Sequence, residues 1–429
     1  MESSISTFCV KPWIHLLIHP DGNISPCCNL YEGPSKGKIF SNNNTPLNIT
    51  INSIEELMHS NTLKEIRSYL LQGKQHPECQ VCWNSEKAKI GSNRIPVYKS
   101  GNKTFSYQEA RKITDINSGE IIADFHLIDF DLRLGNLCNL KCRPCDPTKS
   151  NLLHKDWTTL KEIDCFNDYF KNIGANSKKK YSWVNLDNNL EKIINHTKNA
   201  TSISMAGGEP FLIKAYEAIL QNLINSKRSS EINLRYETNM TLLPQTVIQQ
   251  WPTFQKITLS ISLDGIFKIN DYIRYPSKFE IIEQNISNLQ KMKLPNLIMV
   301  IEITVSIFNI YYLPEILKYH QTKWSNRTTI SFHLLFSPLP YSITVLPISI
   351  KKTISKKLKT FIETCDNSTN IKSDLLGIEN HMMQTHRQGN IFQTFLEITA
   401  HLDTIRKQNI FDYLPEFASL IYDYMENTL

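Results

Sequence analysis

Three cysteines in one short loop limit what this chain can become more than any other feature. They lie in Cys138-Asn-Leu-Lys-Cys142-Arg-Pro-Cys145-Asp-Pro147, with three residues between the first pair and two between the second. A loop of this length can bring three thiols to one face of a single cluster. Structural zinc usually takes four ligands as two separated pairs, which a lone triplet fits poorly. The spacing therefore favours an iron–sulfur cluster with one open iron.

Length and composition exclude several classes of protein. The 429 residues suffice for one large α/β domain with a smaller one attached, since single cores rarely grow past about 300 residues. A net charge of +6 is weak for this size, so no nucleic-acid partner is implied. No apolar run has the length of a membrane span or the form of a signal peptide, so we expect a cytoplasmic protein without a membrane partner.

The ten cysteines fit that location, because thiols in a reducing cytosol are more often metal ligands than disulfides. Cys165 and Cys365 stand apart from the clusters, and we expect them to be ordinary thiols.

The first 120 residues form the predicted small, cysteine-rich domain. Residues 13–18 are an apolar strand, residues 20–23 are a turn signal, and Ile24 continues into Cys27 and Cys28, which together predict a β-hairpin. A predicted helix at 54–71 precedes Cys79 and Cys82. The cysteine pairs of this region can meet at one site, and spacing alone leaves a structural four-cysteine zinc site open.

From residue 126 onward, strands and helices alternate, which favours a mainly parallel sheet or barrel in a core of residues 121–346. Residues 146–196 are an unassigned insertion, and residues 347–429 are predicted to be helical. The predicted strands are 126–134, 201–206, 231–237, 256–263, 297–306 and 328–336. The predicted helices of the core are 151–162, 211–225, 243–250, 279–292 and 312–320.

Five of these strands alternate polar and apolar residues. In the first, Asp129, Asp131 and Arg133 alternate with Phe130 and Leu132. A closed barrel fills its interior with branched apolar side chains, so a polar inner face indicates an open one. We therefore expect a partial (β/α)6 TIM-like barrel, an α/β fold whose inner face holds a polar ligand.

The cysteine triplet resembles that of the radical S-adenosylmethionine (SAM) superfamily. In that superfamily three thiolates hold a 4Fe-4S cluster, and the amino and carboxylate groups of SAM chelate the fourth iron. Met205-Ala-Gly-Gly-Glu-Pro210 resembles its GGEP motif, although a Gly-Gly turn alone is a common joint between strand and helix. Further segments at strand ends resemble its ribose-contacting positions. The resemblance implies SAM contacts from Gly207, Gly208, Glu209, Pro210, Glu237, Thr238, Asn239, Ser262 and Asp264.

The pattern Cys9-x12-Gly22-x4-Cys27 is similar to the opening motif of SPASM and twitch extensions, which bind auxiliary iron–sulfur clusters. Such extensions mostly follow the radical SAM core, whereas this one precedes it. The resemblance implies a second cluster, held by Cys9, Cys27, Cys79 and Cys82. Adjacent residues on an extended chain point to opposite sides, so only one of Cys27 and Cys28 should be a ligand. Cys27 is chosen because its spacing from Gly22 matches the x4 of the family motif.

The implied activity is reductive cleavage of SAM to a 5′-deoxyadenosyl radical that abstracts hydrogen from a substrate. A flavodoxin or ferredoxin is the implied reductant, and a peptide or protein is the leading substrate, with a nucleotide or sugar as the alternative. His333 is expected to face the substrate, and Arg274 is expected either to pair with a carboxylate or to be solvated. A zinc-binding recruitment module without catalysis is the alternative from a different class.

Overall fold

One eight-stranded sheet organises the chain in the computed structural model, which describes residues 6–32, 35, 37–41, 45–87, 92, 94, 105–164, 166, 170, 180–365, 369–384 and 391–427. The strand order is β2-β1-β3-β4-β5-β6-β7-β8. Only β1 and β2 run antiparallel; all other neighbours are parallel. The six core strands confirm the predicted ones: β3 (Asp129–Arg133), β4 (Ser202–Ala206), β5 (Asn233–Thr238), β6 (Lys256–Ser262), β7 (Leu297–Val305) and β8 (Thr328–Leu334).

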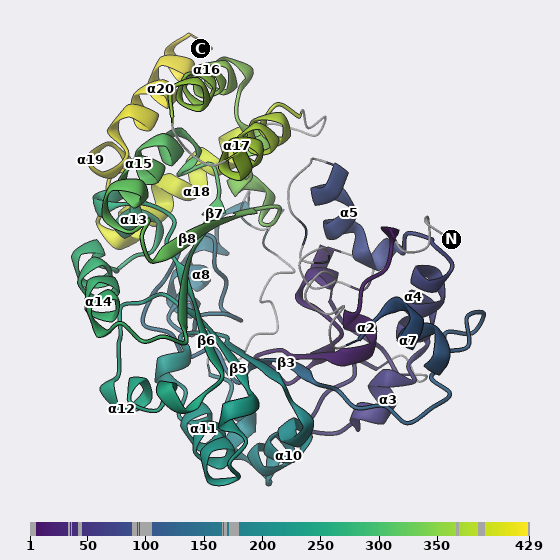
Figure 1. The fold of residues 1–429 in the computed structure, drawn as a ribbon. Coiled ribbons are helices and arrows are strands. Elements are labelled where there is room, and N and C mark those ends of the chain that lie inside the picture. Colours follow the sequence, from purple (N-terminus) through teal and green to yellow (C-terminus); the bar gives the residue numbers. More distant parts are fainter. Residues whose placement is uncertain are drawn as a thin grey trace.

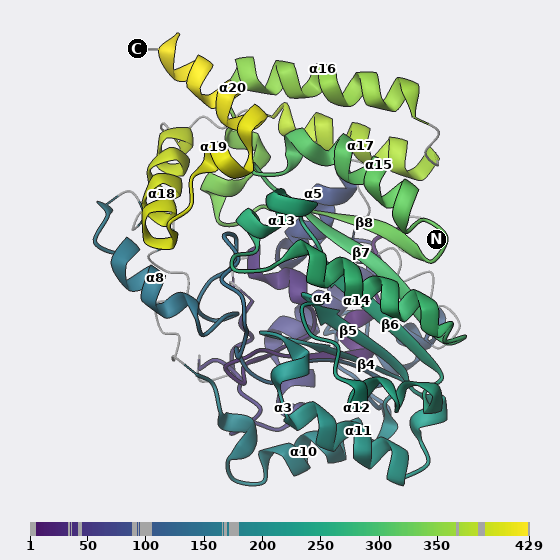
Figure 2. The ribbon, with the colours of Figure 1, turned by 90° about the vertical axis from the view of Figure 1, so that its left-hand side faces the viewer.

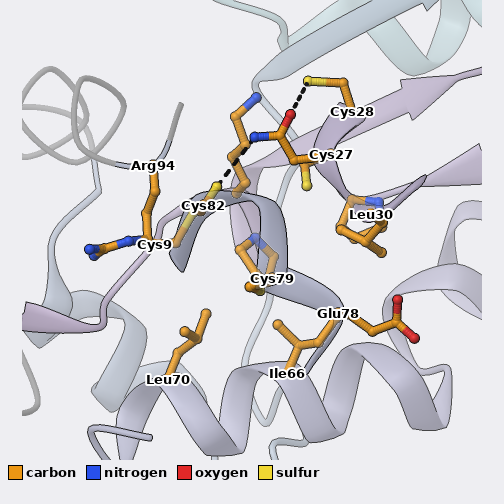
Figure 3. Close-up of a pocket in the computed structure, with 14 residues that line it drawn as sticks. Cys9, Cys27, Cys28, Leu30, Ile66, Leu70, Glu78, Cys79, Cys82 and Arg94 are labelled. Carbon is orange, nitrogen blue, oxygen red and sulfur yellow. Dashed lines mark hydrogen bonds between the residues drawn. The ribbon is translucent and has the colours of Figure 1, made fainter. Parts of the chain in front are cut away.

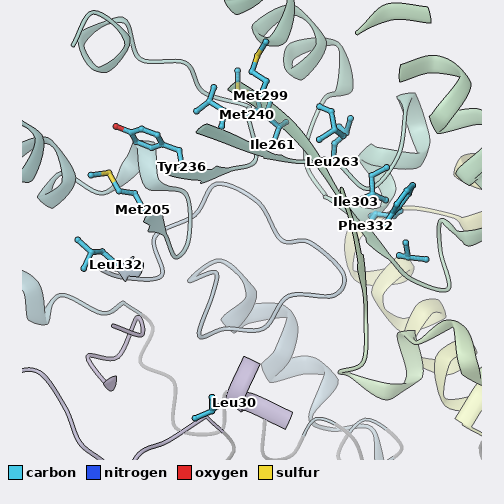
Figure 4. Packing of buried hydrophobic residues seen from close by; sticks show 14 of the residues in the cluster. Leu30, Leu132, Met205, Tyr236, Met240, Ile261, Leu263, Met299, Ile303 and Phe332 are labelled. Carbon is cyan, nitrogen blue, oxygen red and sulfur yellow. The ribbon is translucent and has the colours of Figure 1, made fainter. Parts of the chain in front are cut away.

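Helices follow the core strands and cover the outer side of the curved sheet (Figure 1). The apolar side chains of successive strands pack beneath them, as Figure 4 shows for Leu132, Met205, Tyr236 and Ile261. These helices confirm the predicted ones, with two additions in α10 and α13. They are α8 (Leu153–Leu160), α10 (Asn189–His196), α11 (Ala215–Asn225), α12 (Gln245–Ile248), α13 (Phe267–Ile273), α14 (Phe279–Met292) and α15 (Leu313–Lys323).

The inner face of the sheet carries the polar residues of the alternating strands. On β5, Asn233, Arg235 and Glu237 are half-buried, whereas Leu234 and Tyr236 are buried on the outer face. Within the described residues, β8 has one neighbour and does not close onto β2. The partial, open barrel predicted from the alternation is thus confirmed.

The amino-terminal region begins with the predicted hairpin. β1 (His15–Ile18) pairs with β2 (Ile24–Ser25), and Gly22 in the turn has φ +86°. A Cβ atom on Gly22 would lie 2.8 Å from Asn48 Oδ1, so both the backbone conformation and the contact require glycine. The predicted strand began too early, because Pro12 starts a short helix, α2 (Lys11–Ile14).

The predicted helix at 54–71 is two helices, α3 (Ile54–Met58) and α4 (Asn61–Leu71). The break falls at Ser60, whose hydroxyl caps the second helix by accepting from Leu63 N. Pro77–Cys79 forms a single 3-10 turn, η2, and α5 (Gln80–Lys87) and α7 (Tyr107–Ile113) follow.

The amino-terminal region extends the core sheet. β1 pairs in parallel with β3, with His15 opposite Asp129 and Ile18 opposite Leu132. Buried residues of both regions also belong to one continuous hydrophobic core. The sheet therefore crosses the boundary that we predicted at residue 120.

The carboxy-terminal region is helical, as predicted. Its helices lie at the β8 end of the sheet, whereas the amino-terminal elements lie at the β3 end (Figure 1); Figure 2 shows α18 beside α8. None of the helices in the described ranges is long and apolar enough to cross a membrane. Cys365 is a free thiol and Cys165 lies outside the described residues. The helices are α16 (Ile348–Thr364), α17 (Thr369–Met382), α18 (Ile391–Arg406), α19 (Ile410–Tyr413) and α20 (Pro415–Glu426).

Candidate functional site

The cysteine triplet lies on a loop that leaves the carboxyl end of β3. The Asn136 side-chain amide donates to Pro147 O at 2.9 Å and closes the base of the loop. Inside it, Cys138 N donates to Asn151 Oδ1 at 3.0 Å, and the Ser150 hydroxyl donates to Leu140 O at 2.6 Å. These bonds satisfy loop groups that would otherwise lie buried without partners.

A second segment, residues 272–275, runs beside the loop. Lys141 N donates to Tyr275 O at 2.5 Å, and Arg143 N donates to Ile273 O at 2.8 Å. Arg274 lies in this segment, with Nη1 3.9 Å from Cys142 Sγ and Nε 2.8 Å from an Asp264 carboxylate oxygen. The carboxylate-paired role predicted for Arg274 is therefore confirmed, and the solvated one is wrong.

Charge and burial set the thiol chemistry of the loop. A hydrogen bond with Cys145 and the nearby Arg274 guanidinium lower the pKa of the Cys142 thiol, although burial opposes them. Burial raises the pKa of the Cys138 thiol to about 11. Arg274 thus favours a thiolate at Cys142, the form that binds iron.

Gly207 and Gly208, after β4, allow this strand end to pack directly against the cysteine loop. Both have positive φ, +83° and +56°. A Cβ atom on Gly208 would lie 2.1 Å from Leu137 O, and one on Gly207 would lie 2.9 Å from Arg133 Cβ. Glu209 N also donates to Leu137 O at 2.8 Å. The two glycines are therefore required by the approach of β4 to the loop.

Glu209 is fully buried and joins the ends of β4 and β5. Its carboxylate accepts from Thr238 Oγ1 and Asn239 N, both at 2.8 Å, and from Phe211 N at 3.3 Å. Burial raises the pKa of this carboxyl to about 7, although the three donors favour the charged form. Pro210 follows and begins the 3-10 turn η5 (Pro210–Leu212).

The end of β5 also touches the cysteine loop. The Asn239 side-chain amide donates to Asn139 Oδ1 at 2.9 Å, and Asn139 is the neighbour of Cys138. Sequence reasoning missed Asn139, because an amide in the spacer between two ligands belongs to no motif. The GGEP-like segment, the end of β5 and the cysteine loop therefore meet around residues 137–139.

The other predicted SAM contacts lie in different surroundings. Glu237 is 41% exposed and faces the polar inner side of the sheet, 4.0 Å from Arg235. Ser262 is half-buried at the end of β6. Asp264 is 1% exposed; Oδ1 accepts from Thr304 N at 2.9 Å and Oδ2 pairs with Arg274. Both oxygens of Asp264 thus already have partners within the chain.

The amino-terminal cysteines line one pocket between α2, α4, α5 and the hairpin (Figure 3). It contains about 520 Å³ of space between atoms, part of it open to solvent. Lys11 and Arg94 also line it, and their positive charges oppose the mutual repulsion of thiolates. The cysteines are Cys9, Cys27, Cys28, Cys79 and Cys82.

Cys27 and Cys28 differ in direction. Figure 3 shows the Cys27 sulfur pointing into the space near Cys79 and Leu30, whereas Cys28 turns away from it. Cys28 Sγ instead lies 3.5 Å from Asn29 Oδ1, and Asn29 Nδ2 donates to Cys82 Sγ at 3.3 Å. This arrangement fits the predicted choice of Cys27.

The spacing of the sulfurs bears on which metal fits. Among the described residues, no three His, Cys, Asp or Glu side chains are close enough together to hold a single metal ion. A cubane cluster binds its thiolates at separate corners, farther apart than the ligands of one ion. The described part of the chain therefore shows no ready-made site for a single zinc ion.

Two family profiles match the chain. That of the radical SAM superfamily matches residues 132–318, which include the cysteine loop and the strand ends around it. The SPASM profile, described as an iron–sulfur cluster-binding domain, matches residues 9–84 and spans all five pocket cysteines. No curated protein is similar enough in sequence to count as a match.

Solved structures give more distant similarities. Histidine-tagged anSMEcpe with bound AdoMet has 18% identity and a TM-score of 0.39, over 55% of this chain and 60% of that chain. Native anSMEcpe with bound AdoMet and Cp18Cys peptide has 18% identity and a TM-score of 0.33, over 53% of this chain and 57% of that chain. The chain thus matches less than two thirds of the length of these proteins.

The matched families and the observed donors agree on the cofactors. They are a 4Fe-4S cluster with SAM, and an auxiliary iron–sulfur cluster. Three thiols on a tied loop suit a cluster with one open iron, and the amino-terminal pocket supplies enough thiols to ligate a second one fully. The chain thus carries a radical SAM domain over residues 132–318 and, ahead of it, a SPASM-type iron–sulfur cluster-binding domain over residues 9–84.

Proposed function

We propose that this protein is a radical SAM enzyme, in which the core cluster and SAM, when bound, supply a 5′-deoxyadenosyl radical that abstracts hydrogen from a substrate. One observation carries the proposal. Around Leu137 and Asn139, the cysteine loop is hydrogen-bonded both to the GGEP-like segment, through Glu209 N, and to the end of β5, through Asn239. Glu209 and Asn239, two of the predicted SAM contacts, thus belong to segments that are bonded to the loop of the predicted cluster ligands.

On this proposal, the residues of the core have separate roles in binding the cluster and SAM. Cys138, Cys142 and Cys145 hold the cluster, and Arg274 keeps a positive charge beside Cys142. Glu209, fixed by three donors, offers its carboxylate to the SAM ammonium. The predicted ribose contacts lie at the ends of β5 and β6: Glu237, Thr238, Asn239, Ser262 and Asp264.

In the amino-terminal domain, Cys9, Cys27, Cys79 and Cys82 hold the second cluster. Four thiolates leave it no open iron, so its part is electron transfer or structure. Lys11 and Arg94, which also line the pocket, balance its charge.

The substrate, on this proposal, lies on the polar inner face of the sheet and is a peptide or protein. His333 is 46% exposed there and lies 2.7 Å from Glu302, which also accepts from Arg235 at 2.9 Å. Such groups pair with the amides of an extended peptide, whereas a nucleotide or sugar remains the alternative. A flavodoxin or ferredoxin would reduce the core cluster, and the free thiols of the described chain suit a cytoplasmic location.

Anaerobic reconstitution with iron and sulfide tests the proposal. Under dithionite, the protein should convert SAM to 5′-deoxyadenosine, and the Cys138→Ala/Cys142→Ala/Cys145→Ala variant should lose this activity with one cluster's iron. Cys365→Ala, which removes a thiol outside both sites, is the control. Deoxyadenosine production that survives in the triple variant refutes the assignment. A colourless protein that binds zinc at both sites instead supports the recruitment module.

A further inference from the structure

We infer that the carboxy-terminal helix α18 positions the cluster loop through the two cations that lie between the ligand cysteines, one by a direct ion pair and the other by way of α8. Those cations are Lys141 and Arg143, and their partners are Asp156 on α8 and Asp403 on α18. The inference rests on the proposed function, because it gives residues 391–406 a part in the chemistry of the core cluster.

Arg143, the residue after Cys142, contacts α18 directly. Its side chain is fully buried and forms an ion pair with Asp403. The guanidinium also lies 3.6 Å above the Tyr272 ring, and its Nε donates to Tyr272 O at 3.0 Å. The Tyr272 hydroxyl completes the group by donating to the Asp403 carboxylate, whose oxygens lie at 2.9 and 3.0 Å.

Lys141, the residue before Cys142, has a parallel arrangement. Its Nζ lies 2.8 Å from Asp156 Oδ1, and Asp156 is 1% exposed. The other oxygen of Asp156 accepts from Arg406 Nε of α18 at 3.0 Å. Both spacer cations of the loop therefore lead to α18, Arg143 directly and Lys141 through α8.

Buried charges of this kind cost desolvation and are no evidence of stability in themselves. Their position is the informative point, because apolar packing would hold α18 against the core without placing charge beside the ligands. Asp403 neutralises the guanidinium of the residue that follows Cys142 in the loop, and residues around a cluster ligand set its orientation and its reduction potential. The ion pairs of Lys141 with Asp156 and of Arg143 with Asp403 thus fix both the shape and the charge of the loop.

The sign of the electrostatic effect follows directly. Reduction adds an electron to the core cluster, and a positive charge nearby favours the reduced state. When Asp403 is neutral, Arg143 is uncompensated, so the potential of the core cluster should rise. A purely structural role for Asp403 would loosen the loop without this direction of shift.

The test uses Asp403→Asn in the full-length, anaerobically reconstituted protein. The core cluster is identified by the change that SAM causes in its electron paramagnetic resonance signal, and its potential is measured by redox titration. We expect a higher potential and iron that is lost to a chelator about 10 to 100 times more readily, the range typical of partners that support metal ligands. Glu397→Gln removes a carboxylate from the same helix, where it pairs with Gln393, and should change neither.

Tyr272→Phe keeps the ring beneath Arg143 and removes only the hydroxyl bonded to Asp403, so it serves even if Asp403→Asn does not fold. It leaves the charge of Asp403 in place, so it should loosen iron retention less than Asp403→Asn does, with little change in the potential. A SAM-responsive cluster with wild-type potential and iron retention in both variants overturns this inference alone. A wild-type protein without a SAM-responsive cluster overturns the proposed function and this inference with it.

Discussion

The two cysteine sites are built in opposite ways. The core site takes its three thiols from one loop, whereas the amino-terminal pocket gathers five thiols from three separate segments of chain. In the core, the ligands are local and the supporting charges are distant in sequence, from Arg274, Asp156 and Asp403. In the pocket, the ligands are distant from one another in sequence, and Asn29, which follows Cys28 at the hairpin end, donates to Cys82 Sγ.

This difference predicts that the two sites respond differently to the loss of a single residue. A loop that carries all its ligands keeps them close together in the sequence, so the tertiary contacts around it adjust its shape, charge and position without supplying a ligand. A pocket closed by separate segments depends on every segment, so losing one ligand should cost the whole cluster. The predictions below test that contrast, beginning with the largest effect.

Cys27→Ser should abolish the auxiliary cluster, whereas Cys28→Ser should keep it. The reason is the direction of the two side chains, since Cys27 points into the pocket and Cys28 toward Asn29. Iron analysis should find one cluster's iron missing in Cys27→Ser, while the SAM-responsive signal of the core persists. Cys28→Ser is the matched control, and an inverted result would assign the ligand to Cys28.

Sequence patterns predicted the parts of the fold that depend on local information. The alternation on β5 and β7 identified the strands, and the resemblance at Cys138, Gly207 and Glu237 identified the family. These patterns failed where the end of a helix or the pairing of a strand depends on a contact between distant segments or on one capping hydroxyl. The helix break at Ser60 needs one hydroxyl, and the parallel pairing of His15 with Asp129 joins segments that no short pattern connects.

The sequence predicted which residues contact the cofactors at the candidate site. It did not predict the residues that hold them in position. Asn139, Arg143 and Asp403 belong to no motif, because their roles exist only once α18 and β5 lie against the loop. The protein partners of Asp264, which are Arg274 and Thr304 N, were also beyond the sequence, from which only a contact with SAM hydroxyls was predicted. Sequence motifs identify the residues that contact ligands. The residues that hold those ligand-contacting residues in place can be identified only from the packing of the folded chain.

Glu209→Gln tests how far the core site depends on one buried carboxyl. Burial raises the pKa of Glu209 to about 7 in the folded protein, above the value of about 4.3 for an exposed Glu. The contribution of Glu209 to the free energy of unfolding is therefore fully present below about pH 4 and is lost as the pH rises through 7. The total loss is on the order of 3 kcal/mol. Gln does not ionise, so the variant lacks this part of the pH dependence.

Urea unfolding of the apoprotein between about pH 4.5 and 8 measures the effect, since this window spans both pKa values. The stability of Glu209→Gln relative to wild type should increase across that range, because only wild type must ionise a buried carboxyl. Glu217→Gln removes an exposed carboxylate of α11 and is the control. A constant difference across the range would show that Glu209 is not buried as described.

The smallest expected effect concerns Asn29, whose neutral N–H donor to Cys82 Sγ contrasts with the guanidinium beside Cys142. A donor to a ligand sulfur favours the reduced cluster, so Asn29→Leu should lower the potential of the auxiliary cluster. A neutral hydrogen bond contributes about 0.5–1.5 kcal/mol, which bounds the shift at about 20–65 mV for one electron. Redox titration of the signal that does not respond to SAM measures it, with iron content as the check that the cluster is intact. The SAM-responsive potential of the core cluster is the internal control and should stay unchanged. A shift of both potentials would mean that the two sites are electrostatically coupled, and an unchanged auxiliary potential would mean that Cys82 is not a ligand.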